Sequence, residues 1–201
     1  MPPKPLAVAG AARLRCKVML LGDQGVGKTS LAQVFAGGQL KFRRDYTLTR
    51  GVDLVRKVVQ VPDSPIEVEL FLLDSGGGDI WGELLSPHYA TADAFAFVYD
   101  ITDPDSVTSL ARWYKQVLEK RGEEAITGVV IANKRDLGSE HTAPSVSAGQ
   151  AFSKNHGLEF FEATAPKGDV EAPLDFLAEL FANAYEDRRQ TLLRAANSHA
   201  D

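Results

Sequence analysis

One eight-residue run, Gly22–Thr29, constrains the fold more than any other feature of the chain. Its letters, GDQGVGKT, fit the pattern G-x-x-x-x-G-K-[S/T], which wraps phosphates where it joins a strand to a helix. The apolar run 15–21 precedes it and a helical pattern follows it to about Val34. The helix N-terminus adds a favourable partial charge for an anion. A glycine-rich turn without a ligand is the alternative, but every fixed position of the motif is filled.

The residues of this run divide into side-chain and backbone roles. We expect Lys28 to reach the β- and γ-phosphates and to stabilise charge during phosphoryl transfer, and the Thr29 hydroxyl to ligate Mg²⁺. The other positions are predicted to surround the nucleotide mainly through their backbone N–H groups, and they are Asp23, Gln24, Gly25, Val26, Gly27 and Ser30.

A carboxylate follows the hydrophobic run 66–73. Asp74 has the position expected of the acid that holds magnesium through a water molecule. Gly77 comes three residues later, where a backbone amide can approach a γ-phosphate. An aspartate at the end of a strand is, on its own, more often a turn residue. Beside the phosphate loop we favour the metal role.

The run 129–132 is followed by Asn133-Lys134-Arg135-Asp136, which selects the base. Asp136 can accept two hydrogen bonds from guanine, from N1–H and the 2-amino group, whereas adenine lacks this donor pair. Asn133 is expected to tie this loop to the phosphate loop. A plain polar loop after a buried strand is the alternative. The three motifs together predict binding of GTP or GDP with Mg²⁺.

Strand-like and helical patterns alternate along the chain, which predicts an α/β fold with a six-stranded, mostly parallel sheet and helices on both faces. Pro62–Pro65 joins two strands as an antiparallel hairpin. A helix is expected from Asp103-Pro104 to Leu118 and a last one through Tyr185. The expected strands are 15–21, 52–61, 66–73, 94–99, 128–132 and 158–161.

The length of 201 residues suits one domain with a full core. We expect a flexible N-terminal arm over 1–13, a single nucleotide-binding domain over 14–185, and a tail over 186–201 that is partly helical or frayed. No apolar run approaches the roughly 18 residues of a membrane helix. Neither the first residues nor the last five carry a lipidation signal, so no lipid anchor is expected.

Composition excludes several other classes of protein. The net charge of −5 argues against nucleic-acid binding. A single cysteine, Cys16, excludes an internal disulfide framework and fits a reducing, cytoplasmic location. The four histidines are scattered without ligand-like spacing, so no transition-metal site is expected.

The three motifs, in this order, resemble the Ras superfamily over roughly residues 13–185, and the run 99–102 with Trp113 resembles its Rab branch. The resemblance implies a P-loop small G-protein domain that binds GTP or GDP and Mg²⁺. By position, residues 46–53 correspond to switch I, and Thr49 to the threonine that joins Mg²⁺ only in the GTP state. Phe42 corresponds to the side chain that stacks on guanine. Further nucleotide contacts are implied for Lys134, Thr164, Ala165 and Pro166, with the Ala165 backbone capping the base.

A closer resemblance lies in 46–55, in the turn 61–63 and in 161–173, which are similar to the Rab-like protein 4 family, also called the intraflagellar transport protein 27 family. That resemblance implies a subunit of the ciliary transport complex B and an obligate heterodimer with intraflagellar transport protein 25, besides contacts with other complex B subunits. It also implies a location in the cilium or flagellum and at its base.

The chain departs from the family pattern at Gly78. Ras-like proteins usually have a glutamine there, which orients the attacking water. Glycine has no side chain for this task, so we expect intrinsic hydrolysis no faster than the roughly 3–5 × 10⁻⁴ s⁻¹ of Ras itself. Whether the chain acts as an enzyme stays open. A conventional Rab-type switch that needs an activating protein, and a structural subunit insensitive to nucleotide, are the alternatives to a slow nucleotide sensor.

Overall fold

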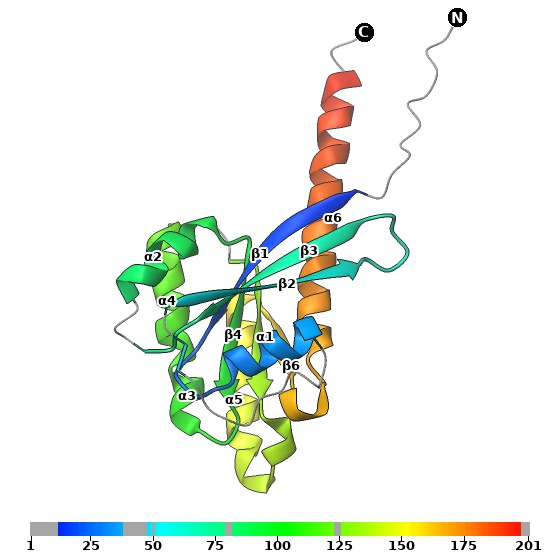
Figure 1. The fold of residues 1–201 in the computed structure, drawn as a ribbon. Coiled ribbons are helices and arrows are strands. Elements are labelled where there is room, and N and C mark those ends of the chain that lie inside the picture. The colour runs from blue at the N-terminus through cyan, green and yellow to red at the C-terminus, as the bar shows by residue number, and fades with distance from the viewer. Residues whose placement is uncertain (1–11, 38–47, 50, 79–81, 123–125, 198–201) are drawn as a thin grey trace, which may run out of the picture.

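The computed structural model describes residues 12–37, 48–49, 51–78, 82–122 and 126–197. Within them, six strands form one sheet in the order β2-β3-β1-β4-β5-β6 (Figure 1). The strands are β1 Arg13–Leu21, β2 Val52–Gln60, β3 Glu67–Ser75, β4 Ala94–Asp100, β5 Gly128–Asn133 and β6 Glu159–Glu162.

The sheet is mixed as predicted: β2 runs antiparallel to β3, and every other neighbouring pair is parallel. The β2–β3 hairpin closes where Val61 N–H donates to the Ile66 carbonyl at 3.1 Å. Two strands are longer than their apolar runs, because β1 begins at Arg13 and β3 continues to Ser75. Asp74 therefore lies inside the sheet.

The helices are α1 Lys28–Gly37, α2 Gly82–Thr91, α3 Pro104–Thr108, α4 Leu110–Arg121, α5 Ala143–His156 and α6 Glu171–Asn197, with short 3₁₀ turns η3 Arg135–Leu137, η4 Glu140–Thr142 and η5 Ala165–Lys167. They cover both faces of the sheet. Alternate side chains of β1 point to opposite faces. Val18 and Leu20 belong to the core beneath α1 and α6, whereas Met19 and Leu21 belong to the core beneath α2, α4 and α5.

Each core is sealed by buried side chains from the helices. Leu31 and Phe35 of α1 and Leu177 of α6 are at most 2% exposed on one face. Leu85 of α2 and Trp113 of α4 are similarly buried on the other. Burying an aliphatic or phenylalanine side chain of this kind contributes about 1.5–3 kcal/mol, so both cores stabilise the packing of the helices on the sheet.

The structure corrects one expectation about this region and confirms another. The single helix expected between Asp103 and Leu118 is divided at Ser109 into α3 and α4. The expected cap is confirmed, because Asp103 Oδ1 accepts from Asp105 N–H at 3.1 Å.

Helices α2 and α5 were not predicted. The buried residues of α5 are Ser145, Gly149 and Ser153, which recur every four positions but are small and not hydrophobic. The apolar period that reveals an amphipathic helix is therefore missing. Tyr99 explains why small residues line this side of α5. Its hydroxyl donates to the Ser145 carbonyl at 3.0 Å, and its ring leaves no room for a side chain at Gly149.

Helix α6 continues beyond the sheet (Figure 1). Its buried residues end at Ala182, and the boundary expected at residue 185 falls inside the helix. Farther along, the side chains of Leu192 and Leu193 are 71% and 53% exposed. Residues 1–11 of the expected arm lie outside the described residues. None of the helices in the described part of the chain combines the length and apolar character that a membrane crossing needs.

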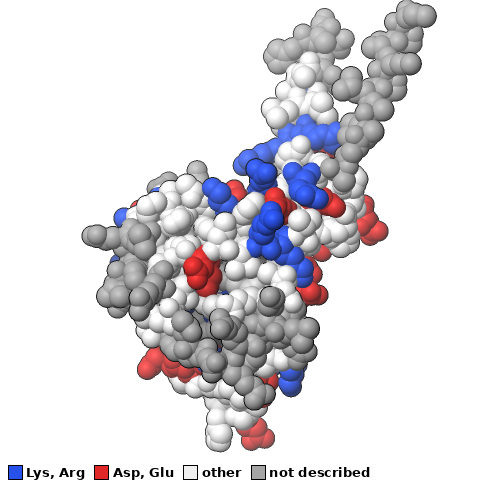
Figure 2. Space-filling model, in the orientation of Figure 1, with Lys and Arg blue, Asp and Glu red and all other residues white. Residues whose placement is uncertain are grey.

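Charged side chains occupy the outer ends of β1, β2 and β3. Arg13 pairs with Glu67 at 2.8 Å, and Glu69 lies between Arg15 at 3.6 Å and Arg56 at 3.2 Å. Figure 2 shows basic side chains gathered over this region, with acidic ones among them. The arginines are largely exposed, so each pair contributes at most about 1 kcal/mol. The arginine side chains on this face of the sheet reach solvent, whereas Val68 and Leu70 on the other face are buried.

Candidate nucleotide-binding site

The three sequence motifs meet at one edge of the sheet. The phosphate loop follows β1, Asp74 lies near the end of β3, and Asn133 ends β5. These strands are parallel, so their carboxyl ends lie on the same side, where α/β proteins bind ligands.

Lys28 is held in the phosphate loop by the loop's own backbone. Its Nζ donates to the carbonyls of Gly22 and Asp23, both at 2.8 Å. The side chain is buried, and burial lowers the pKa of Lys28 to about 8, against the opposing effect of the Asp74 and Asp23 charges. An ammonium has three N–H donors. Two are used by carbonyls, and the remaining one suits a phosphate oxygen.

The predicted magnesium ligands lie together. The hydroxyls of Thr29 and Thr49 are 2.8 Å apart. Asp74 is 1% exposed, and this burial raises its pKa; a hydrogen bond from Thr29 and the Lys28 charge act in the other direction. Asp53 sits opposite Asp74 on β2 and raises that pKa further. A divalent cation here would relieve the crowding of these two carboxylates.

One oxygen of this cluster lacks a partner. Asp74 Oδ1 is buried and accepts no hydrogen bond from any described residue. An unsatisfied buried carboxylate oxygen is costly. Hydroxyl and carboxylate oxygens are also the ligands that Mg²⁺ prefers, often with several waters retained. The residues present therefore fit a magnesium ion at Thr29 and Thr49, with Asp74 acting through water.

Gly77 lies directly against the phosphate loop. A Cβ atom on Gly77 would collide with the backbone between Asp23 and Gln24. The preceding residue, Gly76, donates its N–H to the Gly51 carbonyl at 2.8 Å. The segment after β3 is thus joined both to the phosphate loop and to the start of β2. Gly78, the residue after Gly77, is half-buried and has no side chain.

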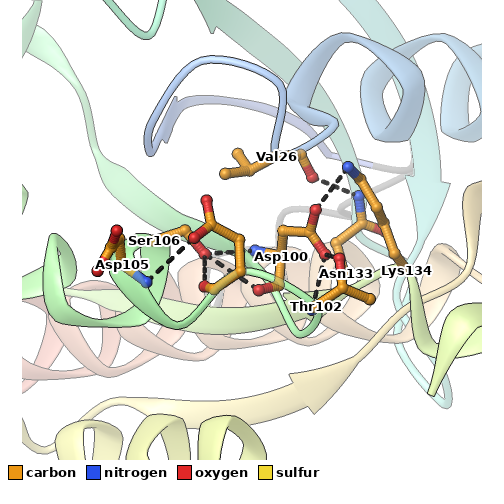
Figure 3. Close-up of polar contacts among 8 residues, drawn as sticks. Val26, Asp100, Thr102, Asp105, Ser106, Asn133 and Lys134 are labelled. Atoms are coloured by element: carbon orange, nitrogen blue, oxygen red, sulfur yellow. Dashed lines mark hydrogen bonds and ion pairs between the residues drawn. The ribbon is translucent and has the colours of Figure 1, made fainter. Parts of the chain in front are cut away.

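Asn133 connects the base-binding loop to the phosphate loop, as the sequence predicted. Its Nδ2 donates to the Val26 carbonyl at 2.8 Å (Figure 3). The approach is so close that a Cβ atom on Gly27 would collide with Asn133 Nδ2. Asn133 is 2% exposed. The glycine at position 27 is required by this contact as well as by its positive φ of 100°.

Asp136 lies in η3, three residues after Asn133. Its Oδ1 is buried without a hydrogen-bond partner among the described residues. A ligand that offers N–H donors would satisfy it, and guanine offers two through N1 and its 2-amino group. Adenine offers no such pair, so the arrangement favours guanine.

The segment 163–165 lies beside this loop. Ala163 N–H donates to the Ala132 carbonyl at 2.9 Å, and the Ala163 carbonyl accepts from Arg135 N–H at 3.1 Å. Thr164 and Ala165 are buried, and Pro166 follows in η5. The backbone predicted to cap the base is therefore next to the loop that carries Asp136.

Three other residues predicted to contact the nucleotide are described, and a fourth is not. Gln24 and Gly25 form the exposed tip of the phosphate loop, and Ser30 is half-buried in the first turn of α1. Phe42, the predicted stacking residue, lies outside the described residues.

Sequence reasoning missed two cross-element contacts. Asp23 Oδ1 accepts from Arg112 Nη2 at 2.6 Å and from Trp113 Nε1 at 2.8 Å, which ties the phosphate loop to α4. Lys134 Nζ donates to Asp100 Oδ2 at 2.6 Å (Figure 3). Trp113 and Asp100 stand out in the sequence only as parts of a family pattern. Their partners depend on strand register and helix placement, which no local spacing reveals.

Comparisons with known proteins identify a family and several named relatives. A sequence model of the Ras family matches residues 17–181. The chain is 37% identical to the intraflagellar transport protein 27 homolog of Bos taurus over 177 residues, covering 88% of this chain and 95% of that protein. It is 33% identical to intraflagellar transport protein 27 of Chlamydomonas reinhardtii over 189 residues, covering 92% of each. Ras-related protein Rab-7a of Paramecium octaurelia is 32% identical over 176 residues, covering 85% of this chain and 83% of that protein.

Proposed function

This chain belongs to the Ras family of small GTPases, and from that premise we propose that it is a slow, nucleotide-sensing subunit of the intraflagellar transport complex B. Family membership implies binding of guanine nucleotide and Mg²⁺. The proposal adds that the GTP and GDP forms differ in their affinity for partner subunits, and that the chain itself hydrolyses GTP slowly.

A pair of buried carboxylate oxygens carries the proposal. Asp74 Oδ1 and Asp136 Oδ1 find no partner within the described ranges. Asp74 lies near Lys28 and Thr29 of the phosphate loop, and the loop that carries Asp136 is tied to the phosphate loop by the bond from Asn133 to Val26. One bound guanine nucleotide with its magnesium would satisfy both oxygens. This pairing supports a nucleotide site better than a structural loop, which would leave both buried oxygens unsatisfied.

Magnesium, when bound, would neutralise charge on the β- and γ-phosphates. Thr29 and Thr49 would hold it with their hydroxyls, and Asp74 would orient a water of its shell. Lys28 supplies a fixed positive charge to the phosphates. Thr49 contacts Thr29 and Gly77 lies against the phosphate loop, so both segments would respond to the third phosphate that distinguishes GTP from GDP.

The proposal of slow GTP hydrolysis rests on Gly78, which stands where Ras-like proteins usually have a glutamine. No side chain is available at this position to orient a water molecule, and Lys28 alone stabilises charge without activating the nucleophile. Single-turnover hydrolysis of GTP by the purified chain should not exceed about 5 × 10⁻⁴ s⁻¹. Gly78→Gln should increase this rate, with Lys120→Gln, exposed in the last turn of α4 and outside the phosphate-binding segments, as the control. A fast wild-type rate without any partner protein would refute this part.

The transport role rests on similarity to relatives named for intraflagellar transport. We propose a heterodimer with intraflagellar transport protein 25, contacts with other complex B subunits, and a location in the cytoplasm and in the cilium or flagellum and its base. We also propose residues 14–185 as the nucleotide-binding domain, with 1–13 and 186–201 outside it.

Partner affinity in the two nucleotide states tests the sensing role. Candidate complex B subunits are titrated against the chain loaded with GDP or with a non-hydrolysable GTP analogue. Sensing predicts an affinity ratio of about fivefold or more for at least one subunit. Equal affinities for all of them would favour a structural subunit. A GTP preference combined with strong acceleration of hydrolysis by an activating protein would favour the conventional Rab-type switch.

A further inference from the structure

Asp100, the last residue of β4, lies in a polar network beside Asn133 and Lys134. The residue is 7% exposed. Its Oδ1 accepts from Thr102 N–H at 2.9 Å and from the Thr102 hydroxyl at 2.7 Å. Its N–H donates to Ser106 Oγ at 3.0 Å. The carboxylate is therefore fixed in one orientation, and Oδ2 remains to act on another group.

That other group is Lys134. Its Nζ donates to Asp100 Oδ2 at 2.6 Å, and the lysine side chain is 32% exposed. The backbone of Lys134 is left-handed, with φ 64° and ψ 34°, a conformation that costs energy for a residue with a side chain. The charge-assisted hydrogen bond holds the end of this side chain at Asp100, and the backbone conformation sets the direction in which the side chain leaves the loop.

Strand register brings the two residues together. Asp100 is paired with Asn133 between the parallel strands β4 and β5, and Lys134 follows Asn133. Figure 3 shows the neighbouring side chains of Asn133 and Lys134 directed to Val26 and Asp100, respectively. In the chain, Lys134 follows Asn133, which is bonded to the phosphate loop, and precedes Asp136 by two residues.

We propose that Asp100 is a positioning residue for nucleotide retention: its carboxylate fixes Lys134 between the phosphate loop and the base-selecting Asp136, so that bound guanine nucleotide dissociates slowly. This inference rests on the proposed nucleotide binding. According to this proposal, Asp100 does not contact the nucleotide and acts only by holding Lys134. Without this bond the lysine stem samples several rotamers, and ordering it becomes a cost of binding.

A purely structural role for Asp100 makes a different prediction. The Thr102 and Ser106 contacts alone would make it a cap for the turn after β4. Asp100→Asn separates the two roles, because its side-chain oxygen still accepts from Thr102 while its charge toward Lys134 is lost. Asp103→Asn is the matched control: Asp103 lies in the same turn, but its carboxylate accepts from Asp105 N–H and not from Lys134.

The test is a double-mutant cycle on the release of a fluorescent GDP analogue from the full chain in Mg²⁺, chased with unlabelled GDP. Asp100→Asn, Lys134→Met and the double variant are compared, with thermal unfolding midpoints recorded for each. We expect Asp100→Asn to release the analogue about tenfold faster, the scale of one partly exposed charge-assisted hydrogen bond. The double variant should release it no faster than Lys134→Met alone, because the two changes remove the same interaction.

Several outcomes would overturn the inference. A release rate of Asp100→Asn within about twofold of the wild-type rate would do so. So would a release rate of Asp103→Asn as high as that of Asp100→Asn. A double variant whose increase in release rate is the product of the two single increases would also do so, because the two residues would then act independently. Asp100→Ser, which also keeps an oxygen near Thr102, is measured in parallel in case the asparagine variant fails to fold. Failure of the wild-type chain to take up the analogue at all would instead refute the proposed function, and this inference with it.

Discussion

We propose that Asp136 selects the base, because its buried Oδ1 has no partner among the described residues and guanine supplies N–H donors that adenine lacks. Asp136→Asn removes the charge from both expected hydrogen bonds. At about 1.5–3 kcal/mol for each charge-assisted bond, GDP affinity should fall by a factor of roughly 10²–10⁴. Competition binding measures this, with Glu140→Gln in the neighbouring exposed turn as the control. Unchanged GDP affinity in Asp136→Asn would remove this residue from the site.

Lys28 gives nucleotide binding a pH dependence. Burial lowers the pKa of Lys28 to about 8 in the free chain, and adjacent phosphate charge would raise it again. Binding therefore takes up a proton at pH values where the free lysine has lost one. GDP affinity should be nearly constant below pH 7 and decline above pH 8, approaching about tenfold per pH unit.

Calorimetry of GDP binding between pH 6.5 and 8.8, in buffers of different ionisation enthalpy, measures both the affinity and the proton uptake. Lys28→Met should bind weakly and without this pH dependence. Constant affinity in the wild-type chain across that range would mean that Lys28 keeps its proton in the free protein.

At this scale the sequence predicts residue types well and their partners poorly. Fixed spacing within one segment is enough to point to Lys28, Asp74 and Asp136. The contact from Asn133 to the phosphate loop was also expected, and it is present. By contrast, the bond between Asp100 and Lys134 depends on the register of two parallel strands, and such register is a tertiary property.

Among the elements, α6 supports the sheet with only its first part. Its buried residues end at Ala182, whereas Leu192 and Leu193 are exposed. Removing residues 186–201 should therefore change the unfolding midpoint by less than about 3 °C, and GDP affinity by less than about twofold. Leu177→Ala, within the buried part, should cost about 2–5 kcal/mol of unfolding free energy. A truncated chain as unstable as Leu177→Ala would place the domain boundary beyond residue 185.

The elements that sequence reasoning found or missed follow from their packing. Strands β4 and β5 are apolar runs buried on both faces, and β3 is nearly so, which made their existence predictable. Strands β1, β2 and β6 are partly exposed, but each still holds a short run of apolar residues. Helix α5 packs a stripe of small residues, Ser145, Gly149 and Ser153, against the sheet and escaped detection. The break between α3 and α4 at Ser109 was missed because the apolar spacing continues across it.

For the whole molecule, the nucleotide would be part of the structure that holds the motif loops together. Asn133, Gly77 and Thr49 all contact the phosphate loop or its first helical turn. A ligand at 1,000 times its Kd adds about 4 kcal/mol of stability, which for a chain of this size raises the unfolding midpoint by roughly 8–16 °C.

GDP with Mg²⁺ should produce this stabilisation in thermal unfolding, and chelating the Mg²⁺ should remove a large part of it. ATP with Mg²⁺ at the same concentration is the control. An unfolding midpoint that is unchanged by GDP, with or without Mg²⁺, would show that the loops are assembled by the protein alone.

Titration calorimetry of the full chain with GDP, GTP and ATP in the presence of Mg²⁺ tests the central claim most directly. The geometry of Asp136, Asn133 and the phosphate loop predicts saturable one-to-one binding of GDP and GTP, with no displacement by ATP. The absence of binding heat for both guanine nucleotides, or displacement by ATP at equal concentration, would contradict it.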